Sequence, residues 1–369
     1  MRPGSYSRVV VIILLTVLAV ILGGFPKSMA VMGATSRSEI ERRLALPPFA
    51  YVAETEHDYS KIEQGQLEVK GALAFIDSLK DVLVDRPENG ARFLALGSAS
   101  PDIVRGASET LAGRAEFVEL HPFDLTEAKD RDRLWLRGGF PRSFLADTAE
   151  NSRAWREGFI RTFLERDLAQ LGIRVPAPAM RRFWTMLAHL HGQTLNSSEI
   201  GRSLGISDKT VRSYLDILTG TFMMRQLQPW HENLGKRQVK SPKIYFRDTG
   251  LLHGLLEIGD RHALLGHPRL GASWEGFAVE QIARRLAPSE VYFWATHGGA
   301  ELDLFFLREG RRFGVECKFS EAPQVRRSMR VAKEDLSLDH LWIVHPGEHS
   351  YPIDDGISAV PLGDYVAGL

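Results

Sequence analysis

The sequence contains 369 residues, a length that is enough for roughly two or three globular domains. Of these residues 44% are hydrophobic and 25% are charged, which is typical of a globular protein. Its 46 basic and 46 acidic side chains balance, which excludes a general attraction to nucleic acid or acidic lipid and leaves only local charged surfaces. Cys317 is the only cysteine, so an intramolecular disulfide and a thiolate zinc cluster are excluded. This is typical of a reducing compartment, and we expect a cytoplasmic protein.

The first 30 residues combine a positive flank, an apolar run and small residues. Two arginines precede the apolar run 9–22, and Ser28-Met29-Ala30 follows it. This order is typical of a secretory signal, although the run is short for a membrane span, which needs roughly 20 residues. Three interpretations stay open: a signal-like or anchor-like segment, with membrane contact only if residues 9–25 act as an anchor; a buried strand; and a wrongly assigned start.

Short apolar runs and helix signals alternate in the first part of the chain. A continuous apolar run at 93–96 suits a buried parallel strand, Ser100-Pro101 is typical of a helix start, and another strand is predicted at 117–120. This strand–helix–strand order indicates an α/β fold. A strongly helical region follows at 151–218, and strands return at 244–246, 291–294, 302–307, 313–318 and 341–344.

A helix-turn-helix is predicted between residues 197 and 218. The first helix covers 197–204, Gly205-Ile206-Ser207 forms the turn, and the Ser207 hydroxyl caps the second helix. The outward face of that second helix carries Lys209, Thr210, Arg212 and Ser213, where base edges or phosphates would lie. Many units of this kind bind proteins or are structural, so that interpretation stays open beside DNA contact.

Basic residues gather directly after the helix-turn-helix. A wing strand is predicted at 222–227, and the basic residues are Arg225, Lys236, Arg237, Lys240 and Lys243, opposed only by Glu232. Phosphate contacts need lysine and arginine at this density, whereas an ordinary solvated loop is the alternative. We predict a DNA-binding surface formed by Lys209, Thr210, Arg212, Ser213, Lys236, Arg237 and Lys240.

Acidic residues and a lysine recur on two predicted strands near the C-terminus. The turn at 308–311 predicts that 302–307 and 313–318 pair as a hairpin. Asp303 lies on the first strand, and Glu316 and Lys318 share one face of the second. Two carboxylates beside a lysine are suited to hold Mg²⁺ and to direct a water molecule to phosphorus.

This arrangement is the PD-(D/E)XK nuclease pattern, which an upstream helical glutamate usually completes. Glu275 is the first candidate for that glutamate and Glu280 the second. We therefore predict that Glu275, Asp303, Glu316 and Lys318 are catalytic, and that Asp303 and Glu316 are the metal ligands. Cys317 should point the opposite way and pack in the core. An inactive, structural copy of the fold is the alternative.

A complete phosphate-binding loop is missing from the sequence. Such a loop needs Gly-x-x-x-x-Gly-Lys-Ser/Thr between a strand and a helix. The nearest match is Gly23-Gly24-Phe25-Pro26-Lys27-Ser28, in which Pro26 replaces the glycine before the lysine and removes an amide donor. The nearest Walker B stretch, at 73–78, has Ser78 where a glutamate should follow the aspartate. We expect no ATP hydrolysis by this chain alone.

Six segments occur in a fixed order at 92–101, 134–141, 163–168, 241–248, 274–277 and 297–303. They resemble the prokaryotic predicted AAA+ ATPase family that carries a C-terminal domain of unknown function with a PD-(D/E)XK-like core. The resemblance implies ATP as a ligand, with Ser98 after the sensor-1 strand, a lid that begins at 138–141, and a lid or interface arginine at Arg161 or Arg166. Residues 1–70 depart from the family, which favours a frameshift, a degraded gene or a mis-called start.

The expected fold class is α/β. The expected segments are 1–30, signal-like or anchor-like; 31–130, a partial AAA+ core; 131–190, a helical lid; 191–240, a winged helix-turn-helix; and 241–369, a PD-(D/E)XK-like domain. The expected function is that of a DNA-associated, AAA+-like homo-oligomer with a Mg²⁺-dependent nuclease-like domain. The alternative is a non-catalytic DNA- or protein-binding regulatory protein with a relic nuclease fold.

Overall fold

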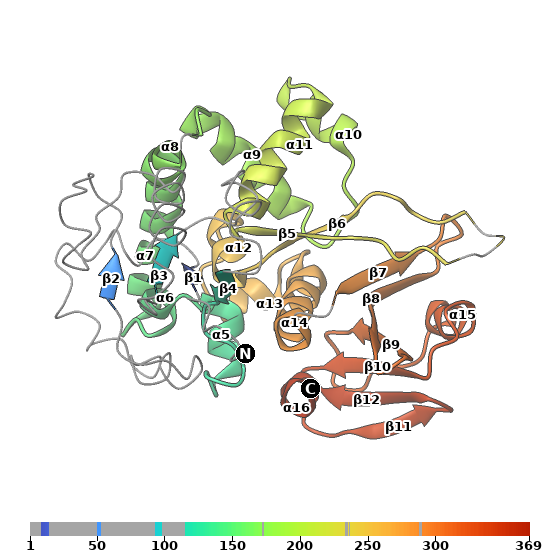
Figure 1. Cartoon of the computed structure of the whole chain (residues 1–369). Coiled ribbons are helices and arrows are strands. Elements are labelled where there is room, and N and C mark those ends of the chain that lie inside the picture. Colours follow the sequence, from blue (N-terminus) through green and yellow to red (C-terminus); the bar gives the residue numbers. More distant parts are fainter. Residues whose placement is uncertain are drawn as a thin grey trace, which may run out of the picture. The chain divides into compact units, whose positions relative to one another are not determined.

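The computed structural model describes residues 9–14, 50–52, 93–97 and 115–369, apart from residues 172, 233, 234, 236, 288 and 289. Figure 1 shows the described elements coloured along the sequence. The chain divides into two compact units. The N-terminal unit comprises residues 1–121, 169–173 and 220–222, and the main unit comprises 122–168, 174–219 and 223–369.

The described strands of the N-terminal unit form a four-stranded parallel sheet. They are β1 (Val9–Leu14), β2 (Ala50–Val52), β3 (Phe93–Gly97) and β4 (Ala115–Leu120), in the order β2-β3-β1-β4. The start of the N-terminal apolar run is therefore a strand with a partner on each side. The strands predicted at 93–96 and 117–120 are confirmed. Ser98, the loop-like stretch 23–28 and the stretch 73–78 lie outside the described residues.

Helices build the first part of the main unit. They are α5 (Arg131–Arg137), α6 (Pro141–Phe144), α7 (Ala149–Thr162), the π-helical turn η4 (Phe163–Asp167) and α9 (Ala177–His189); the short α8 (Leu168–Gln170) belongs to this unit only by its first residue. Caps fix their starts: Asp130 accepts from the Arg133 N–H, and Thr148 accepts from the Asn151 N–H. Buried Arg156 of α7 donates to the Leu136 and Gly250 carbonyls at 3.2 and 3.1 Å, which joins three helical segments.

The predicted helix-turn-helix is confirmed as α10 (Ser197–Leu204) and α11 (Asp208–Gly220). Gly205 ends α10 with a φ of 69°, a left-handed conformation that favours glycine. The Ser207 hydroxyl accepts from the Thr210 N–H at 3.1 Å, as expected of a cap. After α11, β5 (Met224–Leu227) pairs antiparallel with β6 (Lys243–Phe246), so residues 228–242 form a long hairpin connection, which we call the wing.

The wing joins the C-terminal sheet instead of standing free. The Trp230 N–H donates to the Phe293 carbonyl at 2.7 Å, and the Val239 N–H donates to the Ala295 carbonyl at 3.0 Å. Both acceptors lie on the strand β7 (Val291–Ala295), which is the edge strand of that sheet. The segment that follows the helix-turn-helix is thereby fixed to the C-terminal part of the main unit.

The C-terminal sheet has six strands in the order β11-β12-β10-β9-β8-β7. The others are β8 (Glu301–Arg308), β9 (Arg311–Cys317), β10 (His340–His345), β11 (Tyr351–Asp354) and β12 (Ile357–Pro361). β10 is parallel to β9 and β12, and the remaining pairs are antiparallel. The accompanying helices are α12 (Thr249–Leu255), α13 (Arg261–Leu265), α14 (Leu270–Leu286), α15 (Arg327–Asp335) and α16 (Leu362–Gly368).

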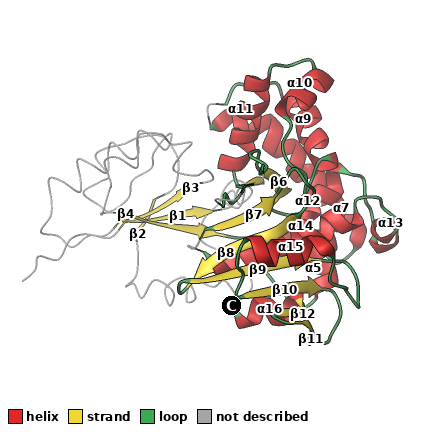
Figure 2. Ribbon diagram, turned by 90° about the vertical axis from the view of Figure 1, so that its right-hand side faces the viewer, coloured by secondary structure: helices red, strands yellow, loops and turns green. Residues whose placement is uncertain are grey.

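Helices α15 and α16 cover opposite faces of this sheet. Met329 of α15 shares a buried core with Ile343 of β10, and Figure 2 shows α15 lying across the sheet. Tyr365 of α16 instead contacts Trp342, with ring centroids 5.3 Å apart. Because neighbouring residues of a strand point to opposite faces, the two helices lie on opposite sides. The fold is mixed α/β, and none of its described helices has the length and apolarity needed to cross a bilayer.

Candidate acidic site

The β8–β9 hairpin places Asp303 and Glu316 on the same face of the sheet. The predicted pairing of these strands is confirmed, with Leu304 opposite Val315 and Phe305 opposite Gly314. Continuing this register puts Asp303 opposite Glu316, and cross-strand neighbours share a face. Their relative exposures are 4% and 5%, so both carboxyl groups are withdrawn from bulk water.

Lys318 and the backbone of Cys317 contact these two carboxylates. The Lys318 ammonium Nζ lies 2.5 Å from Glu316 Oε1, and the Cys317 N–H donates to Asp303 Oδ2 at 2.9 Å. The Cys317 side chain alternates with its neighbours and is buried, as the strand pattern predicts. Two acids and one lysine therefore lie together at this end of the hairpin.

Helix α14 brings Glu275 to the same place, and Lys243 connects it to the hairpin. Lys243 Nζ lies 3.0 Å from Glu275 Oε1 and 3.3 Å from Asp303 Oδ1, and it also pairs with Glu301. Glu275 Oε1 accepts a further hydrogen bond from the Tyr245 hydroxyl at 2.6 Å. We call the four carboxylates together the acidic cluster; they are Glu275, Glu301, Asp303 and Glu316.

A glycine and a histidine fix β6 against α14 and thereby position Lys243 against Glu275. A side chain at Gly276 would overlap His191 Nε2, so only glycine admits the ring so close to the helix. His191 Nδ1 accepts from the Phe246 N–H of β6 at 3.0 Å. Burial lowers the pKa of His191 to about 3, so the ring is neutral and serves as this acceptor.

The location of Lys243 differs from the sequence prediction, which placed it on an exposed basic surface. It is 3% exposed, because every residue of β6 is buried. A lysine is almost never fully buried unless it is paired, so a lysine that opens a buried strand signals an acidic partner. That signal was present in the sequence, but it does not identify the partner.

The electrostatics of the cluster keep its lysines charged and one of its acids protonated. Burial and the charge of Asp303 raise the pKa of Glu316 to about 8. Burial, again followed by Asp303, raises the pKa of Glu275. Burial lowers the pKa of Lys243, but the acidic residues around it outweigh that effect and hold its pKa well above the ordinary value. Glu316 therefore carries a proton near neutral pH.

The cluster provides carboxylate oxygens for a divalent cation that keeps several of its water ligands. It does not provide a complete set of protein ligands. Glu316 Oε2 is buried without a hydrogen-bond partner among the described residues, so one ligand oxygen is free. The described residues contain no group of three or more histidine, cysteine or acidic side chains arranged to hold a metal ion. Mg²⁺ commonly uses one or two carboxylates and keeps several waters, so Asp303 and Glu316 fit that mode of binding.

Comparison with known proteins places the chain in a family. A domain of unknown function, DUF8612, matches residues 128–262, and a domain of unknown function, DUF4143, matches residues 270–365. The uncharacterized proteins Rv2008c of Mycobacterium tuberculosis and Mb2031c of Mycobacterium bovis are each 52% identical over 342 residues, which is 89% of this chain and 77% of theirs. The chain belongs to the family of these mycobacterial proteins.

Two solved structures align along almost the whole chain but at low similarity. Can2 from Sulfobacillus thermosulfidooxidans, solved with cyclic tetra-adenylate, is 10% identical, with 98% of each chain covered and a TM-score of 0.21. VC1899 from Vibrio cholerae is 12% identical, with 98% of this chain and 96% of that chain covered and a TM-score of 0.19. TM-scores this low carry no information about the fold or the ligand.

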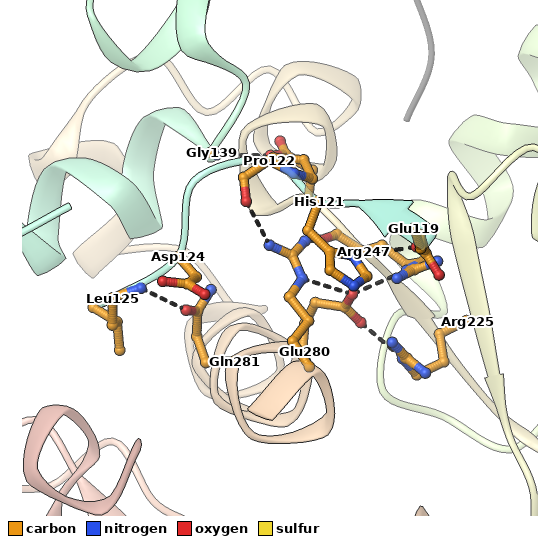
Figure 3. Close-up of polar contacts among 12 residues, drawn as sticks. Glu119, His121, Pro122, Asp124, Leu125, Gly139, Arg225, Arg247, Glu280 and Gln281 are labelled. Atoms are coloured by element: carbon orange, nitrogen blue, oxygen red, sulfur yellow. Dashed lines mark hydrogen bonds and ion pairs between the residues drawn. The ribbon is translucent and has the colours of Figure 1, made fainter. Parts of the chain in front are cut away.

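The acidic cluster and the two lysines that pair with it draw together on both matched segments. Glu275, Asp303, Glu316 and Lys318 belong to the DUF4143 domain, whereas Lys243 belongs to the DUF8612 segment. Glu280, the second candidate for the helical glutamate, lies apart from the cluster. Figure 3 shows it between Arg225 and Arg247.

Three arginines surround Glu280 and keep its carboxylate ionised. The Glu280 carboxylate forms ion pairs with three guanidinium groups, at 2.7 Å from Arg225 Nε, 2.9 Å from Arg247 Nε and 3.0 Å from Arg284 Nε. Burial raises the pKa of Glu280, but the three guanidinium groups outweigh it and hold the pKa well below the ordinary value. Arg225 was expected on the basic surface, and this ion pair is the reason that it is not free there.

The residues of the predicted DNA surface occupy two elements. Lys209, Arg212 and Ser213 are exposed on α11, and Arg237 and Lys240 are exposed on the wing. Thr210 is half-buried, and its hydroxyl lies 2.9 Å from that of Ser207, so it takes part in the helix cap. Lys236 lies outside the described residues.

The two arginines that the family resemblance singled out differ in their surroundings. Arg161 is exposed, whereas Arg166 pairs with buried Asp167 at 3.1 Å inside the π-helical turn. The Arg166 side chain is itself 42% exposed, so exposure does not distinguish the two arginines.

Proposed function

We propose that this chain is a DNA-associated protein whose DUF4143 domain binds a divalent cation through Asp303 and Glu316 and cleaves a phosphodiester bond. The observation that supports the proposal is the alignment of these two carboxylates on one face of the β8–β9 hairpin, with Lys318 Nζ 2.5 Å from Glu316 Oε1. A cation and a fixed ammonium group side by side are the charges that an anionic phosphate requires.

The four site residues divide the work of such a reaction. Asp303, held by the Cys317 N–H, is the fixed ligand. Glu316 offers Oε2, which has no hydrogen-bond partner among the described residues. Lys318 stabilises the negative charge that develops on the phosphate, and Glu275 orients a water molecule. When bound, Mg²⁺ would polarise the phosphate and lower the pKa of its water.

We further propose that the N-terminal unit derives from an AAA+-like nucleotide-binding core, followed by a helical lid and a winged helix. The parallel order β2-β3-β1-β4 supports this, because a first strand flanked by later ones is typical of doubly wound folds that bind nucleotides. The C-terminal domain of unknown function is a second support, since the resembling ATPase family carries one. The exposed basic residues of α11 and the wing support DNA as the partner.

A plasmid-nicking assay tests the nuclease proposal. With Mg²⁺ or Mn²⁺ we expect nicking that EDTA abolishes, and a rate loss of about a hundredfold or more in Asp303→Asn and in Glu316→Gln. Glu334→Gln changes an exposed carboxylate on α15 of the same domain and is the matched control. Wild-type protein without cation-dependent nicking, or full activity in Asp303→Asn, would show that the proposal is wrong.

One observation favours the alternative, a non-catalytic regulatory protein with a relic nuclease fold. The ammonium group of Lys243 already neutralises part of the acidic cluster, which a structural copy of the site would need permanently. Such a protein would bind DNA through α11 and the wing and would keep its fold and DNA affinity when Asp303 is replaced. The nicking assay, combined with a DNA-binding measurement on Asp303→Asn, separates the two functions.

A further inference from the structure

Lys243 is the most deeply enclosed cation of the acidic site. Its ammonium group contacts carboxylates from two elements, Glu275 of α14 and both Glu301 and Asp303 of β8. On another side it lies 5.7 Å from the centre of the Phe293 ring, a distance at which an aromatic face attracts a cation. The surrounding groups thus form a site for a positive charge, and Lys243 fills it.

Lys318, the other lysine of the site, is arranged differently. Its side chain is 28% exposed and it pairs with Glu316, whereas the Lys243 side chain is 4% exposed. Asp303 Oδ1 faces Lys243, and Oδ2 accepts from the Cys317 N–H. Glu316 Oε2 is left as the buried oxygen without a partner. A divalent ion bound between Asp303 and Glu316 must therefore share Asp303 with Lys243.

From this geometry we propose that Lys243 is a built-in cation that competes with the divalent ion for the acidic cluster. The proposal rests on the proposed function, because it concerns the same cation site. In the metal-free protein Lys243 holds Glu275 and Asp303 together, which would otherwise repel each other. When the divalent ion binds, Asp303 exchanges this ammonium contact for the ion. The site therefore stays folded without metal, and its metal affinity is lower than that of the carboxylates alone.

The competition predicts opposite effects of one substitution on metal affinity and on metal-free stability. In full-length Lys243→Met we expect Mn²⁺ to bind about tenfold or more tightly by calorimetric titration, because a positive charge next to the ion is removed. Without metal, the same variant should melt at a lower temperature than wild type, and saturating Mn²⁺ should narrow that difference. Lys243→Arg, which keeps the charge, should retain weak metal binding.

Two controls keep the measurement decisive. Lys129→Met removes one positive charge from an exposed position outside the site and should leave Mn²⁺ affinity unchanged. If Lys243→Met does not fold, the double variant Glu275→Gln/Lys243→Met is compared with Glu275→Gln instead. In both of these proteins the repulsion between the Glu275 and Asp303 carboxylates is absent. The double variant should then bind Mn²⁺ more tightly than Glu275→Gln.

The outcomes separate this inference from the nuclease proposal. Equal or weaker Mn²⁺ binding after loss of Lys243 overturns the competition, while cation-dependent nicking by the wild type would leave the nuclease proposal standing. Tighter binding without nicking supports the competition and overturns the nuclease proposal. Absence of Mn²⁺ binding in both wild type and Lys243→Met overturns both.

Discussion

The carboxyl group of Glu316 is surrounded by charged groups from three strands. Asp303 of β8 and Lys318 of β9 are its neighbours in the hairpin, and the charge of Lys243 on β6 also acts on it. Because burial and Asp303 raise its pKa to about 8, Glu316 carries a proton at neutral pH. A cation that uses Glu316 as a ligand must displace this proton, so metal binding and proton release are linked.

We expect Mn²⁺ affinity to rise as the pH is increased from 6 towards 8, by up to about tenfold per pH unit. The sign follows from competition between the proton and the metal ion for the Glu316 carboxylate. At pH values below the Glu316 pKa of about 8, the proton occupies this ligand. Calorimetric titration at several pH values measures the slope. Glu316→Gln should bind more weakly and show a flatter dependence on pH, and an unchanged slope in that variant would assign the proton to another group.

At the scale of elements, Glu280 joins α14 to β5 and to the residue that follows β6. The carboxylate is shared by three arginines, of which Arg284 also donates to the Pro122 and Arg247 carbonyls at 3.1 Å each. We expect Glu280→Gln to lower the free energy of unfolding by about 3–5 kcal/mol, because three largely buried guanidinium groups lose the carboxylate that they share. Urea denaturation beside Glu334→Gln measures this, and a loss below about 1 kcal/mol would contradict it.

Helix α11 and the wing carry the exposed basic residues, and their role is tested by salt dependence. Replacing Arg212 and Lys240 together by alanine should reduce the log–log slope of DNA affinity against salt by about one unit per lost phosphate contact. Fluorescence anisotropy at increasing salt measures the slope. The double variant Lys129→Ala/Arg285→Ala removes the same charge from exposed positions elsewhere and should keep it. An unchanged slope in the first variant would exclude this surface as the DNA footprint.

Local sequence signals predicted the secondary-structure elements better than they predicted the long-range contacts. Gly205 and Ser207 fixed the helix-turn-helix because a turn and a cap are built from adjacent residues. The β8–β9 hairpin was predictable for the same reason, and with it the shared face of Asp303 and Glu316. Lys243 meets Asp303 across 60 residues of sequence, and no local pattern encodes that distance. Its burial could be inferred from its strand, but its partners needed the structure.

At the scale of the whole molecule, nucleotide binding depends on a loop that the sequence only partly matches. Pro26 removes a backbone donor from the nearest phosphate-binding stretch, so we expect ATP with Mg²⁺ to give no detectable binding at micromolar concentrations. Isothermal titration measures this directly. Restoring a glycine with Pro26→Gly is the matched variant, and micromolar affinity in the wild type would show that another segment supplies the missing donors.

The wing and Lys243 make the gap between the two matched segments a poor place to divide this protein. A fragment that starts at residue 263 would retain all four carboxylates of the cluster but would lose their internal cation and the chain that pairs with β7. Its sheet edge would be open to aggregation, and its acids would repel one another. Expression of the C-terminal domain for separate study, or its transplantation onto another protein, therefore has to begin upstream of the wing.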